Sequence, residues 1–330
     1  MNLIGESRPM EELRTVIEMI APTRLSVLIT GPTGSGKELV AQAIHALSGR
    51  VGRLVAVNIA AVPDAMFEAE FFGHTRGAFT GAIRDRAGLF MEAHRGTLFL
   101  DEVGSFSPWM QPKLLRVLET RRFRPVGARV DQSSEFRTLA ATNEDCDALI
   151  AAQRFRRDLR RRLSEFVIRV PALSERRSDI PMLVRHFAGE AVIGQDAMRV
   201  MEAYEWPDNV RELRQVVECA LALGDGVRLT AHHVLLALGD RMRRTLTTRV
   251  SRAALARRRL MTLLQECGGD TALAAERAGV NRSTIYRRMS RWGIHLHDVH
   301  AESANSHIAN AEVQMARVAS DDVSVQSAIS

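Results

Sequence analysis

Residues 25–38 read Leu25-Ser-Val-Leu-Ile-Thr30-Gly31-Pro-Thr-Gly-Ser-Gly36-Lys37-Glu38, and an apolar segment, 39–47, follows them. The run of Leu, Val and Ile predicts a buried strand, and the apolar segment predicts a helix. A glycine loop in this position places backbone N–H groups and a helix N-terminus around phosphate oxygens, with Lys37 reaching the β- and γ-phosphates. The order therefore predicts a nucleotide-binding α/β domain. The alternative is a glycine-rich turn that binds nothing.

The glycine loop supplies the predicted ATP-binding residues: Gly31, Pro32, Thr33, Gly34, Ser35, Gly36, Lys37 and Glu38. In the general form of this motif the last position is Ser or Thr, whose hydroxyl group holds magnesium. Glu38 occupies that position here, which weakens the match to the general motif.

A second apolar run, residues 97–100, ends in two adjacent carboxylates, Asp101 and Glu102. The C-terminal edge of a parallel sheet is where α/β folds bind ligands. We expect Asp101 to hold Mg²⁺ and Glu102 to polarise the attacking water, because phosphoryl transfer depends on positioning and charge neutralisation. The alternative is an acidic strand end on the surface, which the upstream glycine loop disfavours.

Two further predicted strands end in polar residues. Residues 54–58 end in Asn58, and residues 136–141 are followed by Thr142 and Asn143. Without any functional role, Asn58 could simply start a turn, and Asn143 could cap the next helix.

The bulk composition describes a soluble globular protein. The chain has 330 residues, 46% hydrophobic and 25% charged, which is enough for two or three domains. No apolar run approaches the roughly 20 residues of a membrane span, and the N-terminus lacks a signal-peptide pattern. The cysteines, Cys146, Cys219 and Cys267, are far apart and odd in number. They argue for a reducing cytoplasm and against a disulfide framework or a zinc site.

The C-terminal part is strongly basic and patterned as a helix-turn-helix. Residues 241–297 contain 13 Arg, no Lys and 3 acidic residues, a net charge of +10 against +6 for the whole chain. This predicts contact with nucleic acid. A basic amphipathic helix is expected over 249–267, a short helix capped by Asp270 over 271–278, and a last helix capped by Asn281 over 282–292.

In the last helix, Ile285 and Met289 are four residues apart and are expected to face the core. The residues predicted to face DNA are Arg282, Ser283, Thr284, Tyr286 and Arg287 in the major groove, and Arg288 and Arg291 on phosphates. The alternative is a basic helical bundle used for protein contacts. Pairing of the long helices into dimers would give palindromic half-sites about one or more helical turns apart.

The hexapeptide Gly77-Ala78-Phe79-Thr80-Gly81-Ala82 is expected to reverse tightly and present Phe79 and Thr80, because glycine tolerates backbone angles that other residues resist. The alternative is a turn whose Phe fills the local core. Together with the glycine loop, the acidic pair and the helix-turn-helix, it makes the chain resemble the sigma-54-dependent transcriptional activators (bacterial enhancer-binding proteins). In that family an AAA+ ATPase carries a GAFTGA loop that touches sigma-54. The hexapeptide matches it without a substitution.

The resemblance covers roughly residues 1–297 and implies a function. It implies an ATPase that binds double-stranded enhancer DNA and assembles a ring, a hexamer built from dimers, of one or two kinds of subunit. ATP hydrolysis would push the loop against sigma-54 RNA polymerase and convert the closed promoter complex to the open one. For gene targets, the chain resembles two kinds of regulator that lack a sensor domain: the hypersensitive-response (type III secretion) type and the phage-shock type.

Several residue roles are implied only by this resemblance. Asn58 would hold Glu102 away from the attacking water until ATP is correctly bound. Thr142 and Asn143 would sense the γ-phosphate. Arg211, in the sequence Trp-Pro-Asp-Asn-Val-Arg-Glu-Leu, would reach the nucleotide from a helical lid.

Two arginines, Arg156 and Arg162, align with those that the family points into the neighbouring subunit's ATP, which would make a ring the working unit. On one ideal helix their spacing of six residues turns them about 120° apart. The alternative is a solvated face in which they pair with Asp158 and Glu165.

The predicted fold is an AAA+ P-loop ATPase, a parallel sheet sandwiched by helices, with a helical lid and an all-α Fis-type helix-turn-helix domain. The predicted boundaries are 1–170 for the α/β ATPase part, 171–238 for the lid, 239–248 for a linker, 249–297 for the DNA-binding domain and 298–330 for a disordered tail.

The lid, helical from 177 to 238, is expected to be shorter than in the family between Phe187 and Tyr204, and Asp208 replaces a usual glycine. Only a few residues precede the first helix, so we expect no receiver or ligand-sensing domain in front. Control would then come from expression level or from a partner in trans.

Two other classes of function compete with this one. The first is a DNA-binding regulator that has lost remodelling and uses nucleotide only to control oligomerisation. The second is a helicase or clamp-loader-like ATPase, which would need neither the hexapeptide nor a sequence-specific DNA reader.

Overall fold

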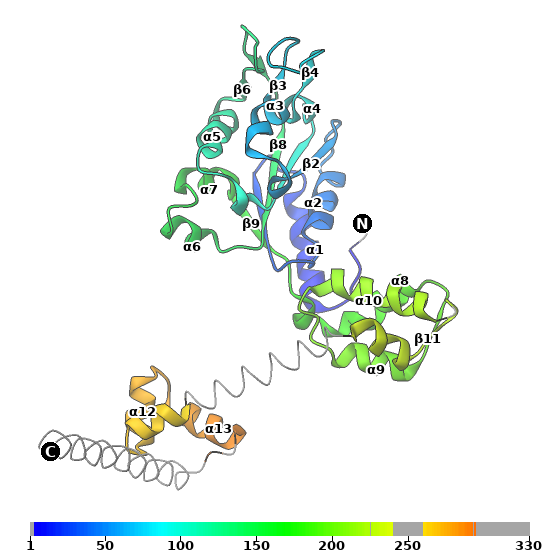
Figure 1. The fold of residues 1–330 in the computed structure, drawn as a ribbon, viewed down its shortest axis with the longest axis vertical. Coiled ribbons are helices and arrows are strands. Elements are labelled where there is room, and N and C mark those ends of the chain that lie inside the picture. Colours follow the sequence, from blue (N-terminus) through cyan, green and yellow to red (C-terminus); the bar gives the residue numbers. More distant parts are fainter. Residues whose placement is uncertain (1–2, 225, 240–259, 293, 295–330) are drawn as a thin grey trace, which may run out of the picture. The chain divides into compact units, whose positions relative to one another are not determined.

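The computed structural model describes residues 3–224, 226–239, 260–292 and 294. The chain divides into two compact units, Met1–Leu238 and Gly239–Ser330 (Figure 1). The predicted linker over 239–248, the start of the helix predicted over 249–267 and the predicted tail over 298–330 lie almost entirely outside the described residues.

A five-stranded parallel sheet forms the centre of the first unit, in the order β2-β5-β8-β1-β9. The strands are β1 (Val27–Thr30), β2 (Leu54–Asn58), β5 (Thr97–Asp101), β8 (Arg137–Thr142) and β9 (Phe166–Arg169). The buried apolar runs were predicted as these strands, and the parallel α/β fold is confirmed. All five strands end at one edge, because they run in the same direction.

Alternate residues of the strands feed two separate cores, as the strand period of two requires. Leu98 and Leu100 of β5 pack into one core, and Phe99 between them packs into the other. Helices α1 (Arg8–Ile20) and α2 (Lys37–Ala46) cover the face of Phe99. The opposite face is covered by α3 (Phe67–Phe72), α4 (Leu89–Glu92), α5 (Met110–Thr120), α6 (Cys146–Ala151) and α7 (Arg157–Leu163).

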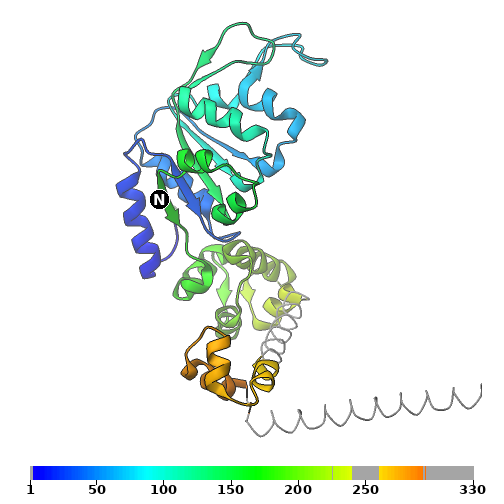
Figure 2. The ribbon, with the colours of Figure 1, turned by 90° about the vertical axis from the view of Figure 1, so that its left-hand side faces the viewer.

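Two short hairpins extend from the sheet, away from the lid (Figures 1 and 2). One pairs β3 (Gly73–His74) with β4 (Arg86–Ala87), and the other pairs β6 (Arg122–Phe123) with β7 (Gln132–Ser133). His74 also bridges to Val126, so the β3–β4 hairpin is joined to the loop between β6 and β7. Helix α3 ends at Phe72, and Gly73 and His74 after it belong to a strand.

The lid follows the sheet and contains both of its first helices, α8 (Ile180–Ala188) and α9 (Gln195–Ala203). The chain turns between them at Gly189 (φ 59°), and β10 (Val192–Ile193) pairs there with β11 (Arg228–Leu229). Helix α10 (Asn209–Leu223) and a helix over 231–239 complete the lid. The short connection expected before Tyr204 thus leaves the helical architecture intact.

In the second unit the described residues form a helix over 260–266, α12 (Thr271–Arg277) and α13 (Arg282–Trp292). The carboxylate of Asp270 accepts hydrogen bonds from the backbone N–H groups of Ala272 and Leu273, so the predicted cap is confirmed. Ile285 and Met289 are buried in a small core with Leu260 and Leu264, as predicted. Within the described part of the chain, no helix is both long and apolar enough to cross a bilayer.

Candidate functional site

The glycine loop 31–36 connects β1 to α2 and contains three glycines with positive φ, Gly31, Gly34 and Gly36. Lys37 begins α2, and its Nζ donates hydrogen bonds to the backbone oxygens of Gly31 (3.0 Å) and Pro32 (3.3 Å). Burial lowers the pKa of Lys37, and the nearby charges of Asp101 and Glu102 oppose that shift. The ammonium group therefore lies within the field of the acidic pair.

The acidic pair occupies the end of β5 and is half-buried. An oxygen of Asp101 accepts a hydrogen bond from the backbone N–H of Glu102 at 2.9 Å. Glu102 has φ 56°, a left-handed conformation that costs a non-glycine residue roughly 1–3 kcal/mol and is common at functional sites. Asn58 lies opposite Asp101 in the sheet register, and its oxygen accepts from the N–H of Ala60, as a turn starter does.

The end of β8 reaches the glycine loop directly. The Asn143 amide nitrogen donates to Thr33 Oγ1 at 2.9 Å, and Gly31 N donates to the Thr142 oxygen at 3.4 Å. The alternative that Asn143 caps the next helix is wrong, because the cap of α6 is Asp145. The side chain of Asn143 therefore binds the glycine loop and does not cap α6.

The lid packs on the same loop. The backbone N–H groups of Val210 and Arg211 donate to the Gly34 oxygen at 3.0 and 3.3 Å. The buried side chain of Asn209 donates to the Thr33 oxygen at 2.9 Å and accepts from Leu173 N at 2.8 Å. Asp208, at the usual glycine position, has φ −96°, which any residue adopts. The substitution is therefore accommodated without strain.

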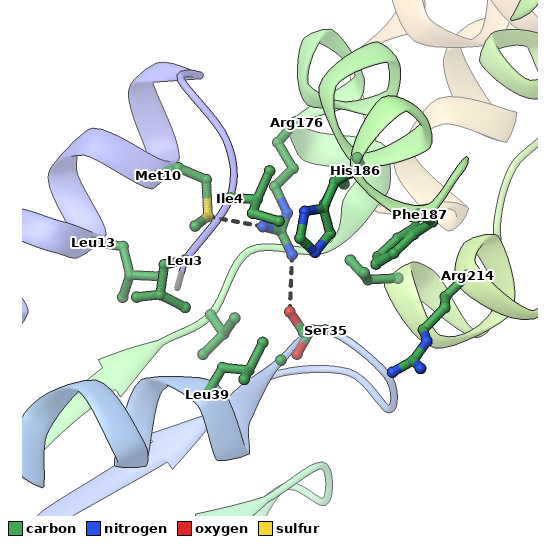
Figure 3. Close-up of a pocket in the computed structure, with 14 residues that line it drawn as sticks. Leu3, Ile4, Met10, Leu13, Ser35, Leu39, Arg176, His186, Phe187 and Arg214 are labelled. Carbon is green, nitrogen blue, oxygen red and sulfur yellow. Dashed lines mark hydrogen bonds between the residues drawn. The ribbon is translucent and has the colours of Figure 1, made fainter. Parts of the chain in front are cut away.

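A cavity of about 500 Å³ opens between the glycine loop, the N-terminal segment and the lid (Figure 3). Its apolar lining comes from Leu3, Ile4, Met10, Leu13, Leu39, Val170, Leu183, Phe187 and Val210. Arg176 of the lid is buried beside it and donates to the Ser35 oxygen and to Met10 Sδ, both at 2.8 Å. Burial lowers the pKa of this guanidinium. An apolar cavity beside a phosphate loop suits a nucleobase.

Asp179 joins the lid to the N-terminal segment. Its carboxylate accepts hydrogen bonds from Glu6 N (2.9 Å), Ser7 N (2.8 Å) and Ser7 Oγ (2.6 Å), and the side chain is 2% exposed. Arg176, Asp179 and Asn209 were not predicted from the sequence as parts of this site. Asp179 stands just before a helix and reads as its cap, but it makes no cap hydrogen bond there.

These residues fit a nucleotide with magnesium. The Ser35 hydroxyl is buried without a hydrogen-bond partner, and the glycine backbone around it is shaped as a cradle. No group of three or more His, Cys, Asp or Glu in the described residues is arranged to bind a metal alone. Magnesium here would therefore need phosphate and water ligands besides the acidic pair, as is usual for this ion in ATPases.

The two arginines lie on and just before α7, and both are ion-paired in this chain. Arg156 forms a two-point contact with Asp158 (Nε–Oδ1 3.0 Å, Nη2–Oδ2 2.6 Å). Arg162 pairs with Glu165 at 3.3 Å and donates to the Leu118 oxygen. Arg156 has an extended backbone and precedes the helix, so the 120° argument for one helix does not apply. Both pairs are at least partly exposed, which makes them weak.

The hexapeptide forms the turn of the β3–β4 hairpin. Gly77 N donates to the Ala82 oxygen at 2.8 Å, and Ala82 N donates to the Phe79 oxygen at 3.0 Å. Phe79 is 45% exposed and touches the His74 ring, with the centroids 4.9 Å apart. The alternative that Phe79 fills the core is therefore wrong. Thr80 is exposed beside it.

The outer face of α13 carries exposed polar side chains, among them Arg282, Ser283, Tyr286, Arg287 and Arg288, while Thr284 is partly buried. Arg282 Nε donates to Thr271 Oγ1 at 3.1 Å, and its guanidinium lies over the Tyr286 ring at 5.6 Å. The Arg291 side chain lies outside the described residues. The first turn of α13 is thus fixed to α12.

Three sequence families match the chain. They are described as Sigma-54 interaction domain over residues 3–169, AAA+ ATPase lid domain over 174–249, and Bacterial regulatory protein, Fis family over 251–292.

Individual proteins match over most of the chain. It is 40% identical over 306 residues to the transcriptional regulatory protein ZraR of Escherichia coli (strain K12), covering 88% of this chain and 68% of ZraR. It is 40% identical over 307 residues to the formate hydrogenlyase transcriptional activator of Salmonella typhimurium (strain SL1344), covering 88% of this chain and 44% of that one. The crystal structure of NtrX from Brucella abortus in complex with ATP has a TM-score of 0.65 at 36% identity, covering 89% of this chain and 69% of NtrX.

Proposed function

Because this chain belongs to the sigma-54-dependent transcriptional activators, whose sigma-54 interaction domain is an AAA+ ATPase, we propose that it remodels sigma-54 RNA polymerase with energy from ATP. It binds enhancer DNA through α13 and converts the closed promoter complex to the open one. The observation that carries the proposal is the exposed Phe79–Thr80 tip, on a hairpin of the same unit as the phosphate loop and the acidic pair.

ATP hydrolysis is assigned to the sheet edge. The glycine loop and Lys37 bind the phosphates, and the apolar cavity beside Arg176 takes the base. Magnesium, held with the help of Asp101, would neutralise phosphate charge. Glu102 orients and polarises the attacking water, and its left-handed backbone fixes its direction. Asn143, bonded to Thr33, lies where it can respond to the γ-phosphate, and Asn58 restrains Glu102 before ATP is bound.

Arg156 and Arg162 act on the neighbouring subunit's ATP. Their ion pairs are exposed and screened by solvent, so a triphosphate can replace the carboxylate partner at little cost. An arginine supplied in trans is worth roughly 10³–10⁵ in rate. The working unit is then a ring, which we propose to be a hexamer assembled from dimers. Arg211 reaches the nucleotide of its own subunit from the lid.

The second unit selects the site on DNA. The exposed face of α13 presents Arg282, Ser283, Tyr286 and Arg287 to the major groove, with Arg288 and Arg291 on phosphates. Contact with DNA places the protein in the cytoplasm of a bacterium. Whether its targets resemble type III secretion or phage-shock genes stays a prediction, and genomic footprinting tests it.

A reconstituted transcription assay with sigma-54 polymerase tests the proposal. Thr80→Ala should abolish open-complex formation and keep ATP hydrolysis within about twofold, because Thr80 lies outside the nucleotide site. Glu102→Ala should stop both. Thr15→Ala, which removes another exposed threonine on α1, is the matched control and should change neither.

Three results would contradict the proposal. Normal open-complex formation by Thr80→Ala shows that the hexapeptide is not the contact with sigma-54. Normal activation by Glu102→Ala shows that open-complex formation does not depend on ATP hydrolysis at this site. An unmodified chain that oligomerises with nucleotide but forms no open complex is the DNA-binding regulator that has lost remodelling.

A further inference from the structure

Gln111 lies in the first turn of α5, and its side-chain amide is fully buried. The residue is 0% exposed. Both its amide oxygen and its amide nitrogen form hydrogen bonds. Its Oε1 accepts a hydrogen bond from the backbone N–H of Arg156 at 2.8 Å. Its Nε2 donates to the backbone oxygens of Phe106 at 3.1 Å and Arg154 at 2.8 Å. One N–H and two C=O partners allow only this orientation of the amide.

Through its hydrogen bond to the Phe106 oxygen, Gln111 is connected to the acidic pair. Glu102 is followed at once by the 3₁₀ turn η3 (Val103–Ser105) and Phe106. Ser105 N donates to the Glu102 oxygen at 2.9 Å, and Phe106 N donates to the Val103 oxygen at 3.3 Å. This segment is compact and its apolar residues are buried, so a shift of the Glu102 backbone moves the Phe106 oxygen that Gln111 holds.

Through the hydrogen bond that its Oε1 accepts, Gln111 is also connected to Arg156, the arginine proposed to act in trans. Gln111 holds the backbone N–H of Arg156, whereas among the described residues the guanidinium pairs only with Asp158, in an exposed contact. The backbone of Arg156 is therefore fixed from the core while its side chain is free to change partners. The position of the Arg156 Cα atom, from which the guanidinium extends, therefore depends on Gln111.

We propose that Gln111 is a positioning residue that links the acidic strand end of one subunit to the Arg156 which that subunit presents to its neighbour. This rests on the proposed role of Arg156 in trans. A rearrangement at Glu102 during hydrolysis then shifts the arginine offered to the next subunit, so neighbouring sites hydrolyse ATP in a coupled way. Gln111 touches neither nucleotide.

The test uses mixed rings of full-length chains. At an ATP concentration too low to fill their weakened site, Lys37→Ala subunits stay empty but still offer Arg156, whereas Arg156→Ala subunits bind ATP but no longer offer the Arg156 guanidinium. Their mixture should regain ATP hydrolysis that neither variant has alone. Gln111→Met is then added to one kind of subunit at a time, because Met keeps the size of the side chain and removes its hydrogen bonds.

Placed in the Lys37→Ala subunit, which donates the arginine, Gln111→Met should lower hydrolysis at least about tenfold, since an ångström of misplacement is worth up to about 10²-fold. Placed in the Arg156→Ala subunit, it should change hydrolysis less than about twofold. Adding Gln111→Met should leave the nucleotide affinity of each parent variant unchanged, as measured with a fluorescent ATP analogue. Gln111→Asn, which keeps the amide but is one methylene too short to reach all three partners, should show the same asymmetry and covers the case in which the Met variant does not fold.

A loss of equal size from both subunits shows that Gln111 only stabilises the core, and no loss from the donating subunit shows that it does not position Arg156. Either result overturns the inference. A parent mixture that fails to regain hydrolysis instead contradicts the role of Arg156 in trans, which is the proposed function itself.

Discussion

The molecule has two glycine-containing loops, and they use glycine for different reasons. In the phosphate loop, a Cβ atom on Gly34 would lie 2.1 Å from the Asp208 oxygen of the lid, and one on Gly31 would lie 2.8 Å from the Val170 oxygen. In the hexapeptide, a Cβ atom on Gly77 or Gly81 would meet nothing within 4 Å. All four glycines have positive φ.

The phosphate loop is therefore enclosed by its own chain, whereas the two glycines of the hexapeptide have open space around them. An enclosed loop keeps its donors aimed at a small ligand without reorganisation. An open loop can change its contacts as a partner binds or leaves. The first arrangement suits a nucleotide, and the second suits a macromolecular surface.

The largest effect that follows from this contrast concerns the two lysines of the chain. Lys37→Ala should weaken ATP binding about 10²-fold, because a charged hydrogen-bond donor in a half-buried site is worth up to about 3 kcal/mol. Lys113→Ala is the matched control and should leave binding unchanged, since Lys113 pairs with Glu68 beside Trp109, apart from the phosphate loop. Fluorescence titration with an ATP analogue measures both. Equal losses would contradict the assignment of Lys37.

A smaller effect separates the glycines themselves. Gly34→Ala should destabilise the protein by about 2–4 kcal/mol. The positive φ is unfavourable for alanine, and the new Cβ atom would also collide with the backbone oxygen of Asp208, which is costly to displace. Gly81→Ala carries only the cost of its φ, about 1–2 kcal/mol. Urea unfolding followed by circular dichroism measures both variants. If the two destabilise equally, the phosphate loop is not enclosed as described.

The smallest effect belongs to the tip of the open loop. Phe79→Ala should change the free energy of unfolding by less than about 1 kcal/mol, because the ring is 45% exposed and touches mainly His74. The Phe79→Ala variant should nevertheless lose its binding to sigma-54 polymerase. Phe71→Ala on α3, which empties a fully buried position, is the contrasting variant and should cost about 3–5 kcal/mol. A large loss of stability from Phe79→Ala would indicate a structural role for the tip.

Much of the fold could be predicted from local pattern. The buried strands, the glycine loop and the acidic strand end are each contiguous in the sequence, and their apolar runs and turn residues specify local structure directly. The helix-turn-helix was predictable for the same reason, because Asp270 caps α12 and Ile285 and Met289 recur on one face of α13.

Other features could not be predicted, because they depend on neighbours that are distant in the sequence. Arg156 stands in an arginine-rich stretch that looks helical, but it leaves the helix where its N–H bonds to Gln111. Asn143 looks like a cap, but it turns to Thr33 of the glycine loop. In both cases the competing partner lies on another element, and a pattern along one segment does not contain it.

The sequence by itself determined the parallel sheet, the phosphate loop and the basic helix-turn-helix, because hydrophobic period, glycine placement and capping act over a few residues. That Phe79 is exposed and does not fill the core was decided by the tertiary structure. Only the tertiary structure decided which buried polar groups meet. Arg137, inside a strand, donates to the backbone oxygens of Ile20, Ala21 and Leu25, and burial lowers its pKa to about 10. Asp179 holds Ser7 across 172 positions of sequence. A buried charge is stable only where distant backbone groups satisfy it, and that condition is met only when the whole chain has folded.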